Sequence, residues 1–147
     1  MSGIQKHIDD SLFLWDNGRH DSAFLIALIA VAAVARRRYP QMKDGESFEQ
    51  FLRDTNLRIT GVEFRGNLQP LEHIFYKWLR CELVHEASLP VDIQFMAESE
   101  LGWMSIRAGG APEYVLKIGH GWFHHMIGSV KQSREYLCAS LPKNLLL

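Results

Sequence analysis

The sequence WLRCELVHE, residues 78–86, closes a predicted helix around which the rest of the chain can be arranged. Pro70 suits the first turn of this helix, because the backbone N–H that proline lacks has no helical partner there. An apolar stripe follows at helical spacing and predicts one buried face. The stripe consists of Leu71, Ile74, Phe75, Trp78 and Leu79. We expect the helix to run to about His85.

Two helices are predicted at the start of the chain. Ser2 and Gln5 form a capping-box pattern ahead of an amphipathic helix that Asn17-Gly18 ends. Residues 23–38 follow and are apolar on nearly every side before Tyr39-Pro40 stops them. A helix that is apolar all round is usually covered on several sides, so we expect this one to be central.

A third, shorter helix is predicted over residues 48–54, because Ser47 and Gln50 repeat the capping-box spacing. Gly61 and Gly66 then predict an irregular connection to the helix that begins near Pro70.

The hydrophobic period changes from 3.6 to 2 between residues 91 and 118, which predicts a small antiparallel β-meander. Its alternating residues are Ile93 and Phe95, then Met104 and Ile106, then Tyr114, Leu116 and Ile118. Helical spacing returns in a last helix that Pro142 ends, with Trp122, Met126, Val130 and Leu137 on one face. We therefore expect one mainly α domain over residues 1–147, with about five helices and the meander inserted before the last.

Composition excludes several classes of protein. Sixteen basic and seventeen acidic residues give a net charge of -1, so the chain lacks the overall positive field of a histone-like DNA binder. Arg36–Arg38 could form a local phosphate rim, but arginines also suit a helix C-terminus. Cys81 and Cys138 form no CxxC pair, which favours a reducing compartment. The longest apolar run, residues 23–35, is too short to span a bilayer, so we expect a cytoplasmic protein without a membrane partner.

Common catalytic signatures are missing from the sequence. It has no GxxxxGK[ST] phosphate loop, no GxGxxG, no HExxH and no GxSxG. His120, His124 and His125 lack a carboxylate at ligand spacing. We therefore predict no metal and no cofactor.

Arg80 and His85, with four residues between them at the end of a helix, resemble the signature of the HEPN superfamily. The order of helices is also similar to HEPN over most of the chain, except residues 91–118. The resemblance implies a HEPN-like bundle and a metal-independent endoribonuclease site at a homodimer interface, with RNA as substrate. It also implies a toxin or defence role, with a nucleotidyltransferase-type antitoxin as partner. Many HEPN ribonucleases have a polar residue directly after the Arg, where this chain has Cys81, and Glu82 could supply an orienting carboxylate one step later.

The chemistry implied for Arg80 and His85 is physically sensible. An imidazole with a pKa of about 6.5 can move a proton at the RNA 2′-hydroxyl or the leaving oxygen near neutral pH. A guanidinium matches phosphate oxygens as charge builds in the transition state. Products would then end in 2′,3′-cyclic phosphate.

Helix geometry leaves alternatives open. Five residues of a regular helix turn by about 500°, so Arg80 and His85 would point about 140° apart. Fraying after Leu83, the long reach of Arg80 or a second subunit could bring them together. Alternatively, His85 caps the helix, and Arg80 pairs with an acidic residue of its own helix. The candidates for that pairing are Glu72, Glu82 and Glu86.

Three functions therefore follow from the sequence. The first is a HEPN ribonuclease that uses Arg80, His85 and Glu82. The second is a non-catalytic HEPN module that binds a nucleotide or a protein partner. The third is a helical scaffold without a small ligand.

Overall fold

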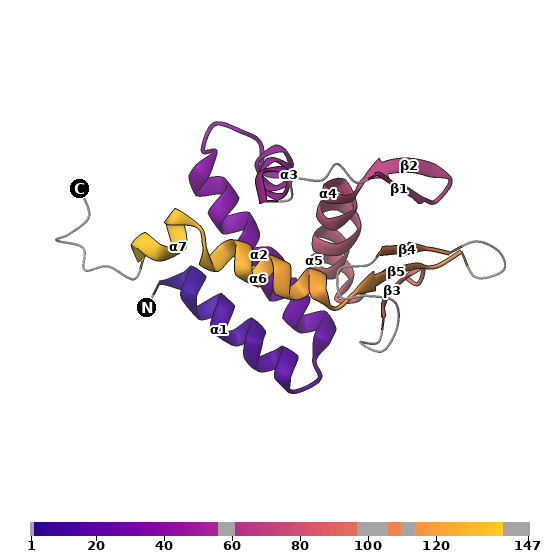
Figure 1. The fold of residues 1–147 in the computed structure, drawn as a ribbon, viewed down its shortest axis with the longest axis horizontal. Helices are drawn as coiled ribbons and strands as arrows, with labels where there is room; N and C mark the ends of the chain where they lie inside the picture. Colours follow the sequence, from indigo (N-terminus) through magenta and orange to yellow (C-terminus); the bar gives the residue numbers. More distant parts are fainter. Residues whose placement is uncertain (1, 56–60, 97–105, 110–113, 140–147) are drawn as a thin grey trace.

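A computed structural model describes residues 2–55, 61–96, 106–109 and 114–139 (Figure 1). The predicted mainly α fold is confirmed, because six helices and only five short strands occupy these ranges. The helices are α1 (Gly3–Asp16), α2 (His20–Arg38), α3 (Asp44–Thr55), the continuous α4 (Leu71–Ile74), η1 (Phe75–Cys81) and α5 (Glu82–Glu86), α6 (Gly121–Lys131) and α7 (Arg134–Ala139). The strands are β1 (Gly61–Phe64), β2 (Asn67–Pro70), β3 (Ile93–Met96), β4 (Ile106–Ala108) and β5 (Leu116–Gly119).

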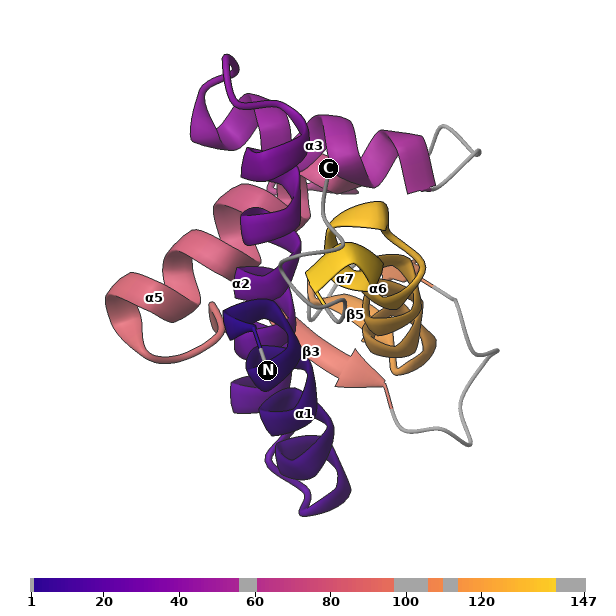
Figure 2. The same ribbon diagram turned by 90° about the vertical axis from the view of Figure 1, so that its left-hand side faces the viewer.

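Helix α2 is the centre of the fold, as its apolar sequence predicted. It packs against α1, α3, η1, α6 and α7, and Figure 2 shows it running behind α1 and beside α6. Its buried residues are Ala23, Phe24, Ala27, Leu28, Ala30, Val31, Val34 and Ala35. Because these residues lie on several sides of the helix, the core surrounds α2.

Aromatic contacts join the helices to the sheet. The Phe24 ring of α2 lies 5.0 Å from Phe95 of β3, 6.0 Å from Phe75 of η1 and 6.2 Å from Phe123 of α6, measured between centroids. Trp15 of α1 stacks on Phe123 with centroids 4.0 Å apart and planes at 4°. These rings fix the helix that carries Arg80 and His85 against both the bundle and β3.

The first predicted capping box is confirmed and the second is wrong. The Gln5 backbone N–H donates to Ser2 Oγ at 3.2 Å, and the Ser2 N–H donates to Gln5 Oε1 at 2.9 Å. Helix α3 instead starts at Asp44, so Ser47 lies buried inside the helix. Its hydroxyl donates to the Asp44 carbonyl at 3.0 Å, a local bond that serine can form within a helix as well as at a cap.

A β-hairpin replaces the irregular connection expected around Gly61 and Gly66. Strands β1 and β2 pair antiparallel, and Arg65-Gly66 forms a two-residue turn in which both residues have positive φ, 53° and 80°. Such turns favour Asn-Gly or Asp-Gly. Because Arg65 stands where Asn or Asp is usual, the sequence pattern did not indicate a hairpin.

The sheet at residues 93–119 is mixed rather than an antiparallel meander. Its order is β3-β5-β4, with β3 parallel to β5 and β4 antiparallel to β5. Strand β5 is the most buried and takes the centre, whereas the largely exposed β4 forms an edge. Ile93 and Phe95 lie in β3, Ile106 lies in β4, and Leu116 and Ile118 lie in β5, as predicted. Tyr114 precedes β5 and has a positive φ of 50°, so its predicted strand position is wrong. Met104 lies outside the described residues.

The expected single last helix is broken into α6 and α7. Ser133 lies between them and accepts a hydrogen bond from the Tyr136 N–H at 3.2 Å, which caps α7. Two bonds from Arg38 to Glu135, at 3.1 and 3.0 Å, tie α7 to α2. Arg38 therefore joins α7 to the central helix. Pro142 and the terminal leucines lie outside the described residues.

Within the part of the chain that the structure describes, none of the helices is both long and apolar enough to cross a lipid bilayer.

Candidate functional site

The helix that carries Arg80 and His85 is continuous from Leu71 to Glu86 (Figure 1). Ala87 ends it in a left-handed conformation, with φ 58° and an N–H···O bond of 3.1 Å to Leu83. The helix therefore does not fray after Leu83. We refer to residues 71–86 as the motif helix.

Seven residues in the middle of the motif helix, Phe75–Cys81, are wound as a π-helix. This winding is rare, usually lasts a single turn and is frequent at functional sites. Phe75 and Leu79 of this segment are buried against the core. Arg80 is the last residue but one of this segment.

Arg80 is paired with a residue on another helix. Its Nη1 lies 3.0 Å from Oδ2 of Asp44, the first residue of α3, and its guanidinium lies 5.7 Å from the centre of the Tyr76 ring. The Arg80 and Asp44 side chains are 26% and 41% exposed, so the pair lies at the surface. Arg80 Nε is buried without a hydrogen-bond partner among the described residues. The alternative pairing with Glu72, Glu82 or Glu86 of the same helix is wrong, because Arg80 pairs with α3 instead.

Tyr76 completes this cluster. Its hydroxyl donates to Asp44 Oδ2 at 3.3 Å, and burial followed by the Asp44 charge raises the pKa of the phenol. A Cβ added at Gly45 would lie 2.8 Å from Tyr76 Cε1, so glycine lets the first turn of α3 approach the ring. We call Asp44, Tyr76 and Arg80 the arginine cluster.

His85 lies on the exposed last turn of the motif helix. It makes no hydrogen bond or ion pair with any residue that the structure describes. The neighbouring Val84 side chain is also exposed, at 51%. His85 does not cap the helix, which was the alternative considered for it. The left-handed residue Ala87 provides the cap.

Glu82 does not form an ion pair with Arg80. Residues two apart on a helix point about 200° apart, and Glu82 lies near Arg65 of the β1–β2 turn. The hydrogen bond that Arg65 donates to Asp92 is the main cause that raises the pKa of Arg65, and the Glu82 charge adds to it. The carboxylate that contacts Arg80 is that of Asp44, which sequence reasoning missed because it lies 36 residues earlier in the chain.

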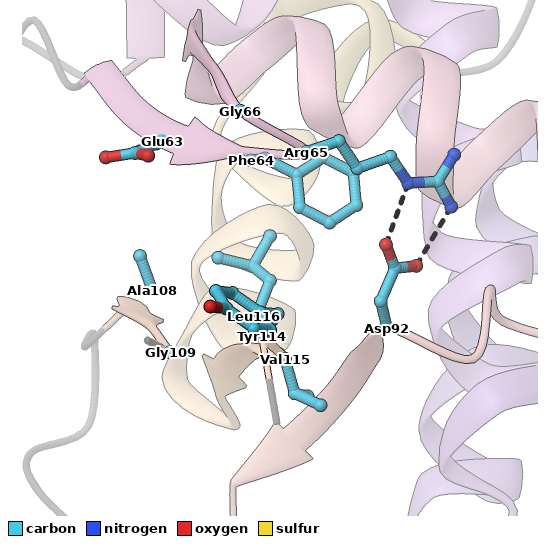
Figure 3. Close-up of a pocket in the computed structure, with 10 residues that line it drawn as sticks. All are labelled: Glu63, Phe64, Arg65, Gly66, Asp92, Ala108, Gly109, Tyr114, Val115 and Leu116. Carbon is cyan, nitrogen blue, oxygen red and sulfur yellow. Dashed lines mark hydrogen bonds and ion pairs between the residues drawn. The ribbon is translucent and has the colours of Figure 1, made fainter. Parts of the chain in front are cut away.

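The opposite side of the motif helix carries a second polar contact. Arg65 Nε and Nη2 donate to Asp92 at 2.8 and 2.9 Å, which holds the pKa of the Asp92 carboxyl below its ordinary value. The Arg65 guanidinium also lies 4.1 Å from the centre of the Trp78 ring. Arg65 thus joins the hairpin to both the motif helix and the start of β3, close to the pocket in Figure 3.

The described residues hold no group of three or more His, Cys, Asp or Glu side chains arranged for a metal ion. His120 and His124 instead pack around Trp15, with centroid distances of 4.9 and 5.5 Å. His125 contacts Trp122, 5.7 Å between centroids, and burial lowers the pKa of its imidazole. Aromatic packing is thus the structural role that the described contacts give to these histidines.

Comparison with known proteins gives a family but no named relative. No curated protein and no solved structure matches the sequence. The Rv1289 family matches over residues 3–109, from the first residue of α1 to just beyond β4. This match includes the whole motif helix and covers most of the sequence, so the chain belongs to the Rv1289 family.

Proposed function

We propose that the protein is a metal-independent endoribonuclease of HEPN type, in which Arg80 and His85 of the partner subunit act on one RNA phosphate. The proposal rests on the resemblance of the Arg80–His85 segment to the HEPN superfamily. The observation that carries the proposal is that the Arg80 and His85 side chains are not buried in the hydrophobic core. His85 is exposed and unbonded among the described residues, and Arg80 has five N–H groups, of which those on Nη1 face Asp44.

The shape of the motif helix favours a site shared between two protomers. Because the helix continues to Glu86, fraying does not bring Arg80 and His85 together. Arg80 is also drawn toward α3 by Asp44. A twofold axis beside the motif helix would place each arginine near the other protomer's histidine, and cyclic dimers are the commonest oligomers.

The proposed reaction needs one base and one cationic clamp. His85 accepts the proton of the RNA 2′-hydroxyl, and the 2′-oxygen attacks phosphorus as the bond to the 5′-oxygen breaks. The leaving oxygen takes a proton from solvent. Arg80 donates hydrogen bonds to the phosphate oxygens as their charge grows. The products end in a 2′,3′-cyclic phosphate and a 5′-hydroxyl.

Cleavage of single-stranded RNA in the presence of a chelator tests this proposal. We expect the wild-type chain to cut RNA and spare DNA, because DNA lacks the 2′-hydroxyl. His85→Ala and Arg80→Lys should each lose most activity, since an ammonium cannot reproduce the bidentate fork. His7→Ala on α1 and Arg19→Lys just before α2 are matched controls at exposed or partly exposed positions outside the arginine cluster. Cutting that depends on a divalent ion, or that survives both substitutions, would contradict the proposal.

A mixing experiment tests the shared site. Arg80→Ala and His85→Ala chains are each expected to be inactive, whereas a mixture allowed to exchange subunits contains mixed dimers with one intact site. Random exchange should restore about a quarter of wild-type activity. A site within one protomer gives no recovery, and a monomer in light scattering would also contradict the shared site.

The Arg80–Asp44 ion pair favours a second candidate, the non-catalytic HEPN module that binds a nucleotide or a protein partner. Asp44 neutralises the guanidinium in the free protein, as expected of a structural arginine. If the chain cuts no RNA under any condition while retaining its fold, this candidate replaces the ribonuclease. The toxin or defence role belongs to the first proposal, and growth arrest in cells that express wild type but not His85→Ala would support it.

A further inference from the structure

A pocket of about 430 Å³ lies between the tip of the β1–β2 hairpin and the ends of β4 and β5 (Figure 3). Arg65 and Asp92 close one side of it, and Glu63 lies on the opposite side, beyond Phe64 and Leu116. Arg80 and His85 do not line this pocket. Its function is therefore separate from the proposed ribonuclease site.

Backbone strain is concentrated at this pocket. Among the described residues, Arg65, Ala87 and Tyr114 are the non-glycine residues with positive φ, and two of the three line the pocket. Such a conformation is strained for a residue with a side chain, and strained residues cluster at ligand sites. The positive φ of Arg65 is explained by its place in the hairpin turn and by its hydrogen bonds to Asp92. Tyr114 lies in the connection between β4 and β5 and is 67% exposed.

The floor of the pocket is apolar and partly aromatic. Phe64 and Leu116 lie at this floor and are almost completely buried, 4% and 1% exposed, so only a small part of each side chain faces the pocket. Tyr114 adds a second aromatic ring that is open to solvent. Apolar walls with a few polar groups are typical of small-molecule sites, and this volume lies near the lower end of their range.

The charges of the lining favour a ligand that donates hydrogen bonds. The Arg65 and Asp92 charges neutralise each other through their two bonds. Glu63 is exposed and forms no ion pair with the described residues, so the described residues of the lining have a net charge of -1. A phosphate or carboxylate would be repelled, whereas an amino group on a ring could donate to Glu63.

We infer that this pocket binds a planar, amino-bearing heteroaromatic ring, of which a nucleobase is the type. The ring stacks on Tyr114 above the apolar floor, and its amino group donates to the Glu63 carboxylate. Any phosphate attached to such a ligand stays outside the pocket, because the lining is negative. A carboxylate that accepts from an exocyclic amino group is an established way of recognising cytosine.

Calorimetric titration of the full chain with cytidine, adenosine and uridine tests the inference. We expect saturable binding of cytidine and adenosine, about tenfold tighter than uridine, which lacks the amino group. Cytidine 5′-monophosphate should bind no more tightly than cytidine. Absence of saturation at millimolar ligand, equal binding of cytidine and uridine, or tighter binding of the monophosphate would overturn the inference.

Variants of the lining locate the bound ring. Tyr114→Ala should weaken cytidine binding about tenfold through lost stacking, whereas Tyr114→Phe should retain it. Glu63→Gln should abolish most of the preference for cytidine over uridine. Glu46→Gln, at an exposed position of α3, is the charge-matched control. Circular dichroism checks that each variant is folded. Unchanged binding by folded Tyr114→Ala would show that the pocket is not the site.

Discussion

Arg80 and Asp44 connect the motif helix to the first residue of α3 through a contact of 3.0 Å between Nη1 and Oδ2. The contact brings together residues 36 positions apart and holds the arginine at the surface of the bundle. It is also the feature that separates the two candidate functions, because an arginine needed only for this ion pair would have no further role.

The Asp44→Asn substitution measures how much the pair stabilises the fold. We expect the free energy of unfolding to fall by less than about 1 kcal/mol, since exposed ion pairs contribute little. Urea denaturation measures it, and Asp10→Asn on the exposed face of α1 is the control. A loss several times larger would assign Arg80 a structural role and favour the non-catalytic module.

Gly45→Ala tests the close approach of α3 to Tyr76. The added Cβ would lie 2.8 Å from the ring, so Tyr76 must move, and this strain opposes a gain in helix propensity of up to about 1 kcal/mol. In a Tyr76→Ala background the clash is gone, and Gly45→Ala should become stabilising. A double-mutant cycle measured by urea denaturation should therefore give a non-zero coupling energy. Additive effects would show that the ring does not restrict residue 45.

Asp92→Asn should weaken the attachment of the hairpin. The two charge-assisted bonds from Arg65 are partly exposed, so we expect a loss of about 1–2 kcal/mol in unfolding free energy. The folded pKa of Asp92 is depressed below its ordinary 3.8, chiefly by the bond from Arg65. Its contribution to stability is therefore full above about pH 3.8 and is lost as the pH falls through the folded pKa. Stability measured against pH should show this acid loss in wild type and a smaller one in Asp92→Asn.

His125 should make stability depend on pH near neutrality. Burial lowers its pKa in the folded protein below the ordinary 6.5, so the unfolded chain takes up a proton at a higher pH than the folded one. Stability from this residue is full above about pH 6.5 and decreases as the pH falls toward the folded pKa. Thermal unfolding between pH 7.5 and 5.5 should show a smaller decrease for His125→Gln than for wild type. His7→Gln on α1 controls for removal of an imidazole, and equal decreases in all three proteins would contradict the prediction.

Local sequence patterns predicted those elements whose formation depends on residues close together in the sequence. The Ser2–Gln5 capping box, the apolar stripe of the motif helix and the alternating residues of β3 and β5 are local, and the structure has each of them. The all-round apolar sequence of α2 likewise predicted its central position. The hairpin was missed because Arg65 is an unusual residue for its turn, and its conformation depends on a distant carboxylate, Asp92.

What the sequence alone determined is therefore the mainly α class, the helix that carries Arg80 and His85, and the resemblance that motivates the ribonuclease proposal. Tertiary structure alone decided the strand order β3-β5-β4, the pairing of Arg80 with Asp44 and the pairing of Arg65 with Asp92. The physical reason is range. Helical periodicity and capping act over a few residues, whereas strand order and ion-pair partners depend on which buried surfaces meet after the chain has folded.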